Sequence, residues 1–268
     1  MKYQIPVLGI PIVNGYKWIE RLINSIDFPI KHVIIIDNSG GKDKTFVKNL
    51  DLLVENGSSF VESMKVCHLP SNIGVAGAWN LIIKSYLMES SWIIANHDIA
   101  FAPGLLEEIF ETAKDSEIGM IHPSGGDFNL GSYDLFMIKD WVVQKIGLFD
   151  ENYYPAYGED ADYIMRLRND PVKSKIGLSK IHLHGDDTAK PGTENYKKEG
   201  RQTAKEGGKV LSMRLDCIND INFEYSFKKW GEGWRWCSPY KTPMNNSELP
   251  LSYTTYDLSF VRMKYLDF

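Results

Sequence analysis

Cysteine is scarce in this sequence, and no two cysteines stand close together. The chain has three, Cys67, Cys217 and Cys237, without a CxxC pair. An odd number at wide spacing predicts reduced thiols in a reducing compartment and excludes a zinc site built on cysteine pairs. No apolar run approaches the length of a membrane span, and the first residues lack the apolar core of a signal peptide. We therefore predict a soluble, cytoplasmic protein with no integral membrane segment, and peripheral attachment to a membrane stays open.

Several motifs of nucleotide-binding and hydrolytic proteins are also missing. Without GxxxxGK[ST] there is no P-loop, and without GxGxxG after the first apolar run an ordinary dinucleotide-binding fold is disfavoured. Without GxSxG there is no nucleophile elbow of an α/β-hydrolase. The net charge of −5 argues against broad electrostatic binding to nucleic acid, so no nucleic-acid partner is predicted.

What the sequence does contain is an alternation of short apolar runs with segments of helical spacing. Its 268 residues are 43% hydrophobic and 24% charged, which is typical of a globular protein. Apolar runs predict strands at 7–13, 32–36, 65–69 and 92–95, and helices are predicted between them. Such alternation with short connections is typical of a parallel, doubly wound α/β sheet.

Polar or glycine residues follow each of these apolar runs, at 14–15, 37–41, 72–74 and 96–98. Parallel strands end at one edge of a sheet, so the four clusters are expected to converge on one crevice, where open α/β sheets bind ligands. In the last cluster Asp98 can hold a hard divalent cation, with a diphosphate supplying further oxygens. The alternative is a strand-end turn in which Asn96 and Asp98 accept from backbone amides.

The pattern changes after residue 101. Further strands are predicted at 119–122, 135–138 and 179–184, and a helix from Glu159 through Arg168. Asp162 and Arg166 stand four apart on that helix, and the alternative to a role at a site is that they only pair on the surface, worth about 0.3 kcal/mol.

The end of the chain is rich in aromatic residues, among them Trp230, Trp234 and Trp236. They would suit a platform on which a sugar stacks, but packing of the tail against the domain is the favoured interpretation.

Five segments, in this order and spacing, resemble family 2 glycosyltransferases with the GT-A fold: GIPIVNG, IIIDNSGG, NIGVAGAWN, the NHD turn and GLFDENYYPAYGEDADYIMRLR. The resemblance runs from about residue 7 to residue 184. It implies an α/β fold with a mixed, mostly parallel central sheet flanked by helices and two abutting halves. The expected division is a donor-binding half at 1–100, an acceptor and catalytic half at 101–188, and a helical and aromatic tail at 189–268 packed on them.

The resemblance also implies roles for individual residues. The residues expected to contact the nucleotide sugar are Pro11, Ile12, Val13, Asp37, Asn72, Gly74, Ala76 and Asn96. Asp98 and His184 would bind Mn²⁺ or Mg²⁺, and His182 is the fallback, since only one of these two histidines on the predicted strand is expected to face the site. Asp160 would be the general base, with Glu159 beside it. Asn72 and Asn80 of the NxGxAxAxN motif have local helix capping as an alternative role.

One position departs from the family pattern, because Asn96 stands where most members have an acidic residue. A single carboxylate should bind a metal more weakly in the absence of the diphosphate, although the Asn carbonyl oxygen can still act as a ligand.

The implied activity is an inverting transfer of a sugar from a nucleotide-diphosphate donor, UDP- or GDP-linked, to a hydroxyl of a glycan or glycoprotein acceptor. One alternative is a sugar nucleotidyltransferase, which should carry a glycine-rich, basic loop that GIPIVNGYKW lacks. The other is a non-catalytic binding protein on the same fold, which the Asn96 departure favours.

Overall fold

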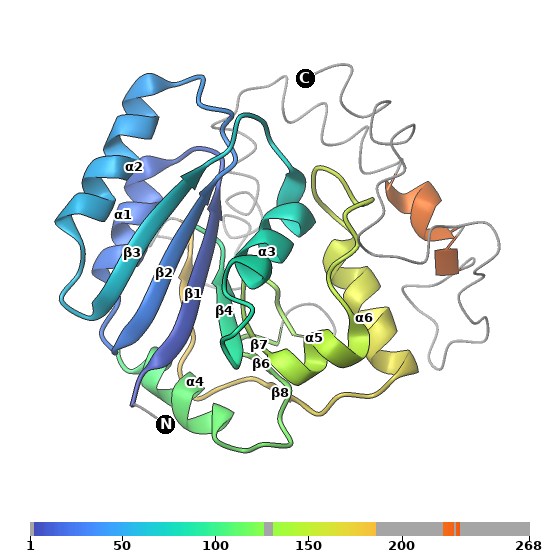
Figure 1. Ribbon diagram of the computed structural model, residues 1–268. Coiled ribbons are helices and arrows are strands. Elements are labelled where there is room, and N and C mark those ends of the chain that lie inside the picture. Colours follow the sequence, from blue (N-terminus) through green and yellow to red (C-terminus); the bar gives the residue numbers. More distant parts are fainter. Residues whose placement is uncertain (1–2, 126–130, 186–221, 228, 231–268) are drawn as a thin grey trace.

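A computed structural model describes residues 3–125, 131–185, 222–227 and 229–230 (Figure 1). The strands are β1 (Ile5–Ile12), β2 (Ile30–Asp37), β3 (Val61–His68), β4 (Ser91–Ala95), β5 (Ile99–Ala100), β6 (Met120–His122), β7 (Leu135–Lys139), β8 (Ser174–Ile176) and β9 (Leu183–His184). The helices are α1 (Tyr16–Asn24), α2 (Lys44–Asn56), α3 (Gly74–Ser85), α4 (Leu105–Ala113), α5 (Asp140–Ile146) and α6 (Glu159–Asn169).

Seven strands form one sheet in the order β3-β2-β1-β4-β7-β6-β8. Strands β1 to β4 are parallel, β7 runs antiparallel to both β4 and β6, and β8 is parallel to β6. The sheet is therefore mixed and mostly parallel, which confirms the predicted fold class. Pairing of β4 with β7 joins the two predicted halves in one sheet, and their division at residue 100 stays a prediction.

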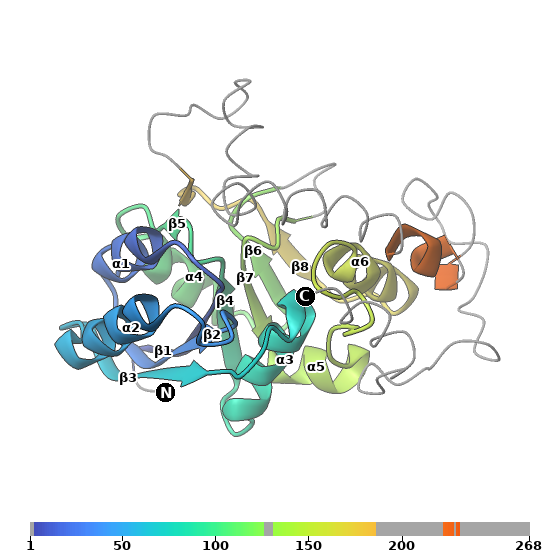
Figure 2. The same cartoon turned by 90° about the horizontal axis from the view of Figure 1, so that it is seen from above.

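Helices cover both faces of the sheet (Figures 1 and 2). Residues of α1, α2 and α4 pack against one face, where Leu8, Ile10 and Ile93 are buried. Residues of α3, α5 and α6 pack against the other face, where Val7 and Ile94 are buried. Neighbouring residues of one strand thus face opposite cores, which explains why the central strands are continuous apolar runs. No helix in the described ranges is long and apolar enough to span a bilayer.

The strands at the two edges differ from the sequence-based expectation. Strand β3 begins at Val61 rather than residue 65, because its first half contains Glu62 and Ser63 and is only partly buried at the sheet edge. Strand β8 was not predicted, and of the predicted strand at 179–184 only β9 is present. Strand β8 has three residues and pairs with β6, and β9 has two residues and pairs with β5. Strands this short have too few residues to show a hydrophobic pattern.

Residues 222–227 and 229–230 are helical and pack on α6. Trp230 is 2% exposed, lies against Met165, and donates its indole N–H to Asp162 Oδ1 at 2.8 Å. Core packing of Trp230 is therefore confirmed, whereas Trp234, Trp236 and most of the tail lie outside the described residues.

Candidate active site

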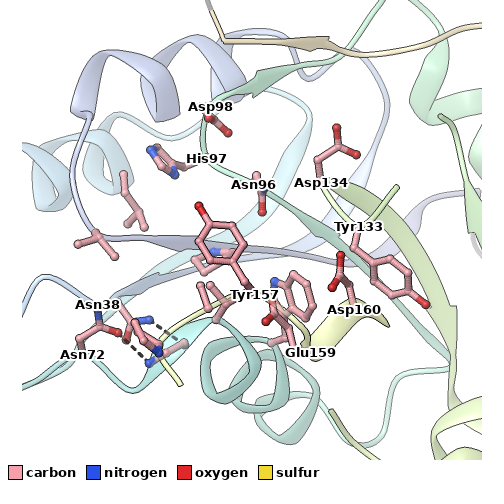
Figure 3. Close-up of a pocket in the computed structure, with 18 of the residues that line it drawn as sticks. Asn38, Asn72, Asn96, His97, Asp98, Tyr133, Asp134, Tyr157, Glu159 and Asp160 are labelled. Carbon is pink, nitrogen blue, oxygen red and sulfur yellow. Dashed lines mark hydrogen bonds between the residues drawn. The ribbon is translucent and has the colours of Figure 1, made fainter. Parts of the chain in front are cut away.

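A cavity of about 380 Å³ opens at the sheet edge where β1, β2 and β4 end. It is also lined by residues before β7 and by the chain leading into α6 (Figure 3). The predicted site residues that line it are Pro11, Ile12, Val13, Asn72, Gly74, Asn96, Asp98, Glu159, Asp160 and His184. Two predicted residues, Asp37 and Ala76, do not line it. Asp98 and Asp160, expected on opposite sides of a reacting sugar, thus share one cavity.

Four ionisable side chains form what we call the cavity cluster: Asp98, Asp134, His182 and His184. His184 Nε2 lies 3.3 Å from Asp98 Oδ1, and its Nδ1 lies 3.5 Å from Asp134 Oδ2. His182 Nε2 donates to Asp134 Oδ2 at 2.8 Å. Asp134 Oδ2 thus contacts both histidine rings, because side chains two residues apart in an extended chain lie on the same face. His184 lines the cavity, and His182 does not.

Burial and neighbouring charges shift the pKa values of this cluster in opposite directions. Burial raises the pKa of Asp98, but the hydrogen bond from His184 and the charges of His97 and His184 outweigh it and hold that pKa below its ordinary value. Burial likewise raises the pKa of Asp134, yet His182 and His184 lower it to about 2 overall. Burial lowers the pKa of His184, and its hydrogen bond to Asp98 with the two carboxylate charges raises it above the ordinary value. The carboxylates are thus ionised at neutral pH.

Asp134 was missed by reasoning from the sequence. The polar clusters predicted to form the site follow the C-terminal ends of parallel strands. Asp134 instead precedes β7, which runs antiparallel to β4 and so begins at the same edge. The backbone carbonyl of Asp134 accepts from Asn96 N at 2.8 Å. Asp134 therefore brings a second carboxylate close to the position where Asn96 departs from the family pattern. A polar residue directly before a buried strand was the available signal.

The residues that could hold a divalent cation are Asp98 and His184. Their facing atoms lie 3.3 Å apart and both side chains line the cavity, so a carboxylate oxygen and an imidazole nitrogen are available together. In the described part of the chain, no cluster of three or more His, Cys, Asp or Glu side chains has the arrangement of a metal site. A two-residue site fits a cation that takes its other ligands from phosphate oxygens and water.

At one end of the cavity, two asparagines organise the loop before α3 (Figure 3). Asn38 accepts from Ile73 N at 3.2 Å and donates to the Gly74 carbonyl at 3.1 Å. Asn72 Oδ1 accepts from Gly74 N at 2.7 Å, so its local capping role is present alongside its place at the cavity. Asn38 was not predicted as a site residue, although it directly follows Asp37.

Three predicted nucleotide contacts have structural roles, and of these three only Gly74 also lines the cavity. Asp37 is fully buried, accepts from Ser39 N at 2.9 Å, and lies 2.6 Å from His68 Nδ1. Gly74 has φ +80°, and a Cβ there would meet the Tyr154 ring at 2.9 Å. Packing against the chain before α6 therefore accounts for this glycine. Ala76 is buried in the core.

The opposite side of the cavity is formed where α6 begins. Glu159 is buried and Asp160 is half-buried, and both line the cavity. Asp160 Oδ1 accepts from Ala161 N at 2.7 Å, which orients the carboxyl group. The helix N-terminus favours the ionised form of a carboxyl group.

A second group of charged side chains joins α6 to the segments packed against it. We call it the buried cluster, and its members are Asp150, Asp162, Arg166 and Lys229. Lys229 Nζ lies 2.7 Å from both Asp150 Oδ2 and Asp162 Oδ1, and Arg166 Nε donates to Asp162 Oδ2 at 3.0 Å. The alternative that Asp162 and Arg166 only pair on the surface is wrong, since their side chains are 0% and 5% exposed. Spacing on α6 correctly paired them, but the packing of residues 222–230 over α6 was not visible in the sequence.

Asn80 has a structural role across the fold rather than a local capping role. From the middle of α3 it accepts from Phe149 N at 2.9 Å and donates to the Phe149 carbonyl at 2.9 Å and to Glu151 Oε1 at 2.8 Å. It thereby connects α3 to the segment that leads towards α6.

Comparisons with known proteins fit this geometry. No protein-family model matches the sequence. A galactofuranosyl glycosyltransferase of Leishmania donovani is 26% identical, over a match covering 61% of this chain and 52% of that protein. The chain thus spans about half the length of this relative.

Solved structures of glycosyltransferases resemble the fold. TarS of S. aureus in complex with UDP-GlcNAc has a TM-score of 0.52 at 16% identity, covering 83% of this chain and 72% of that chain. GalNAc-T7 with UDP, GalNAc and Mn²⁺ has a TM-score of 0.53 at 13% identity, covering 68% of this chain and 44% of that chain. Together with the sequence relative, they confirm the predicted resemblance to glycosyltransferases with the GT-A fold.

Proposed function

We propose that this protein is an inverting glycosyltransferase that moves a sugar from a nucleotide-diphosphate donor to an acceptor hydroxyl. The observation that carries the proposal is the shared cavity, which has Asp98 and His184 on one side and Asp160 on the other. A UDP-sugar is the favoured donor, because the TarS and GalNAc-T7 structures contain UDP-GlcNAc or UDP.

The donor would lie along the ends of β1, β2 and β4. Asn38, Asn72 and the backbone of 11–13 would contact the nucleoside, and Asp98 with His184 would hold Mn²⁺ or Mg²⁺. When bound, such a cation offsets the negative charge that develops on the departing diphosphate. Asp134 would orient the His184 ring from its other nitrogen, as carboxylates commonly do for metal-binding histidines.

Asp160 would act on the acceptor. As the acceptor oxygen forms its bond to the anomeric carbon, its proton passes to the Asp160 carboxylate. The bond from that carbon to the phosphate oxygen breaks, and its electron pair leaves with the nucleoside diphosphate. A single displacement of this kind inverts the anomeric centre without a covalent enzyme intermediate.

Thermal unfolding with UDP, GDP, dTDP and CMP sugars, each with and without Mn²⁺, tests the donor side. We expect at least one donor to raise the unfolding midpoint, and to raise it further with Mn²⁺, because a ligand that binds only the folded state stabilises it. Absence of metal-dependent stabilisation across the panel would contradict the proposal.

Replacing Asp160 with Asn tests the catalytic side. Turnover should fall by about 10²- to 10⁴-fold while donor binding is retained, because the amide cannot accept the proton. Wild-type protein that binds a donor but never turns it over would favour the non-catalytic alternative.

A further inference from the structure

Tyr157 has an unusual backbone conformation at the mouth of the cavity. Its φ is 75°, and in the ranges that the structure describes no other non-glycine residue has a positive φ. The side chain lines the cavity and the residue is 46% exposed, three positions before Asp160. For a bulky residue the left-handed region is costly, and it persists only where surrounding contacts require it.

Those contacts come from both sides of the turn. Asn222, which is 1% exposed, donates its side-chain amide to the carbonyls of Ala156 and Tyr157, each at 2.9 Å. On the other side Pro155 O accepts from Val75 N at 2.8 Å. The turn is thus held between α3 and the C-terminal helical residues, which fixes the direction of the Tyr157 side chain.

Figure 3 shows where that side chain lies. In that view the ring lies between Asn96 and His97 on one side and Glu159 on the other, and these residues line the same cavity as Asp160. A flat apolar ring beside carboxylate and amide groups matches the chemistry of a sugar, which has an apolar C–H face and hydroxyls at its rim. Tyrosine also provides a large contact surface at a low entropic cost.

We propose that Tyr157 is a specificity-determining residue that stacks on a sugar ring of the acceptor, and that Asn222 is the positioning residue that aims it. The inference rests on the proposed function and deepens it, because it names the acceptor as a saccharide rather than a polyol or a peptide hydroxyl. The acceptor is preferred over the donor because Tyr157 is exposed to solvent while lining the cavity, and because it lies three residues before the proposed base.

The experiment compares variants of the full chain by NMR titration in the presence of UDP and Mn²⁺. The probes are octyl glycosides of galactose, galactofuranose, mannose and N-acetylglucosamine, with ribitol and a Ser/Thr peptide as non-saccharide probes. Tyr157→Asn removes the ring while keeping a residue that tolerates the left-handed backbone. Tyr157→Phe keeps the ring, and Asn222→Ala removes both hydrogen bonds. Phe227→Ala is the matched control, because Phe227 is 45% exposed on the same C-terminal helical segment and does not line the cavity.

We expect at least one octyl glycoside to bind the wild type, and Tyr157→Asn to weaken that binding about tenfold or more. The glycoside affinity of Tyr157→Phe should stay within about threefold of the wild type, and Phe227→Ala should leave that affinity unchanged. The affinity of Asn222→Ala should fall between those of Tyr157→Phe and Tyr157→Asn. UDP affinity should be unchanged in all four variants, which also checks their folding.

Three results would overturn the inference while leaving the proposed function intact: UDP binding without binding of any glycoside, equal losses in Tyr157→Phe and Tyr157→Asn, or loss of UDP affinity in Tyr157→Asn alone. Failure of the wild type to bind UDP or any other nucleotide would instead overturn the proposed function.

Discussion

The cavity cluster and the buried cluster have similar groups but opposite surroundings. The cavity cluster pairs its carboxylates with histidines, and three of its four members line an open cavity. The buried cluster pairs its carboxylates with a lysine and an arginine, and all four of its side chains are at most 5% exposed. Histidine can exchange its proton for a metal ion, whereas buried Lys and Arg stay charged beside an ionised carboxylate. We therefore expect the cavity cluster to serve ligands and the buried cluster to hold α6 in place.

Removing the buried cation should have the largest effect. Lys229→Met leaves Asp150 and Asp162 without their shared partner, so we expect a loss of about 3–5 kcal/mol in the free energy of unfolding. Urea unfolding measures it. The matched control is Lys173→Met, whose exposed pairs with Asp115 and Glu117 should contribute less than about 1 kcal/mol. Equal losses in both variants would show that the buried cluster does not hold the fold.

In the cavity cluster we expect a substitution to affect sugar transfer more than the free energy of unfolding. Asp98→Asn should lower sugar transfer by about 10²- to 10³-fold and abolish the Mn²⁺-dependent gain in thermal stability with UDP, because the carboxylate ligand is lost. The free energy of unfolding without ligand should fall by less than in Lys229→Met, because the partner His184 still has Asp134 nearby and no buried charge is left unpaired. A variant that binds UDP and Mn²⁺ like the wild type would remove Asp98 from the metal site.

Asn80 belongs to the NxGxAxAxN motif, yet its hydrogen bonds are buried and join two distant segments of the fold. Asn80→Ala leaves the N–H and carbonyl of Phe149 without these partners, and we expect a loss of about 2 kcal/mol in the free energy of unfolding. Ser85→Ala, an exposed change on the same helix, is the control and should change it by less than about 0.5 kcal/mol. UDP affinity of the folded Asn80→Ala protein should be close to that of the wild type.

The smallest predicted effect is a loss of stability at low pH. Burial raises the pKa of Asp150, but the charge of Lys229 and hydrogen bonds from Lys229, Asn152 and Tyr225 hold it below the ordinary value. A carboxyl group with a lowered folded-state pKa stabilises the protein above its unfolded pKa of about 3.9, and the contribution is lost as the pH falls further. Between pH 7 and pH 3 the wild type should therefore lose about 1 kcal/mol more than Asp150→Asn in urea unfolding. Identical pH profiles would contradict this assignment.

The accuracy of the sequence-based predictions follows the strength of the local signal. Strands β1, β2 and β4 were found because buried parallel strands are continuous apolar runs, and the residues after β4 were placed at the site because such strands end together. Edge strand β3 was shortened and β8 was missed because half-exposed or very short strands have weak patterns. Asp134 was missed because its strand runs the other way.

The alternating α/β architecture and the sheet edge where polar residues gather could be predicted from the sequence alone, since both depend on periodicity and on the common direction of parallel strands. Apart from the Asp162–Arg166 pair, which spacing predicted, and the Asp98–His184 pair, which the resemblance implied, the meeting of ionisable groups depended on tertiary packing. Asp134 reaches His184 through an antiparallel strand, Lys229 reaches Asp162 from a segment 67 residues later, and Asn222 reaches Tyr157 across a similar separation. Such contacts depend on how distant segments pack, and no local pattern of residues encodes them.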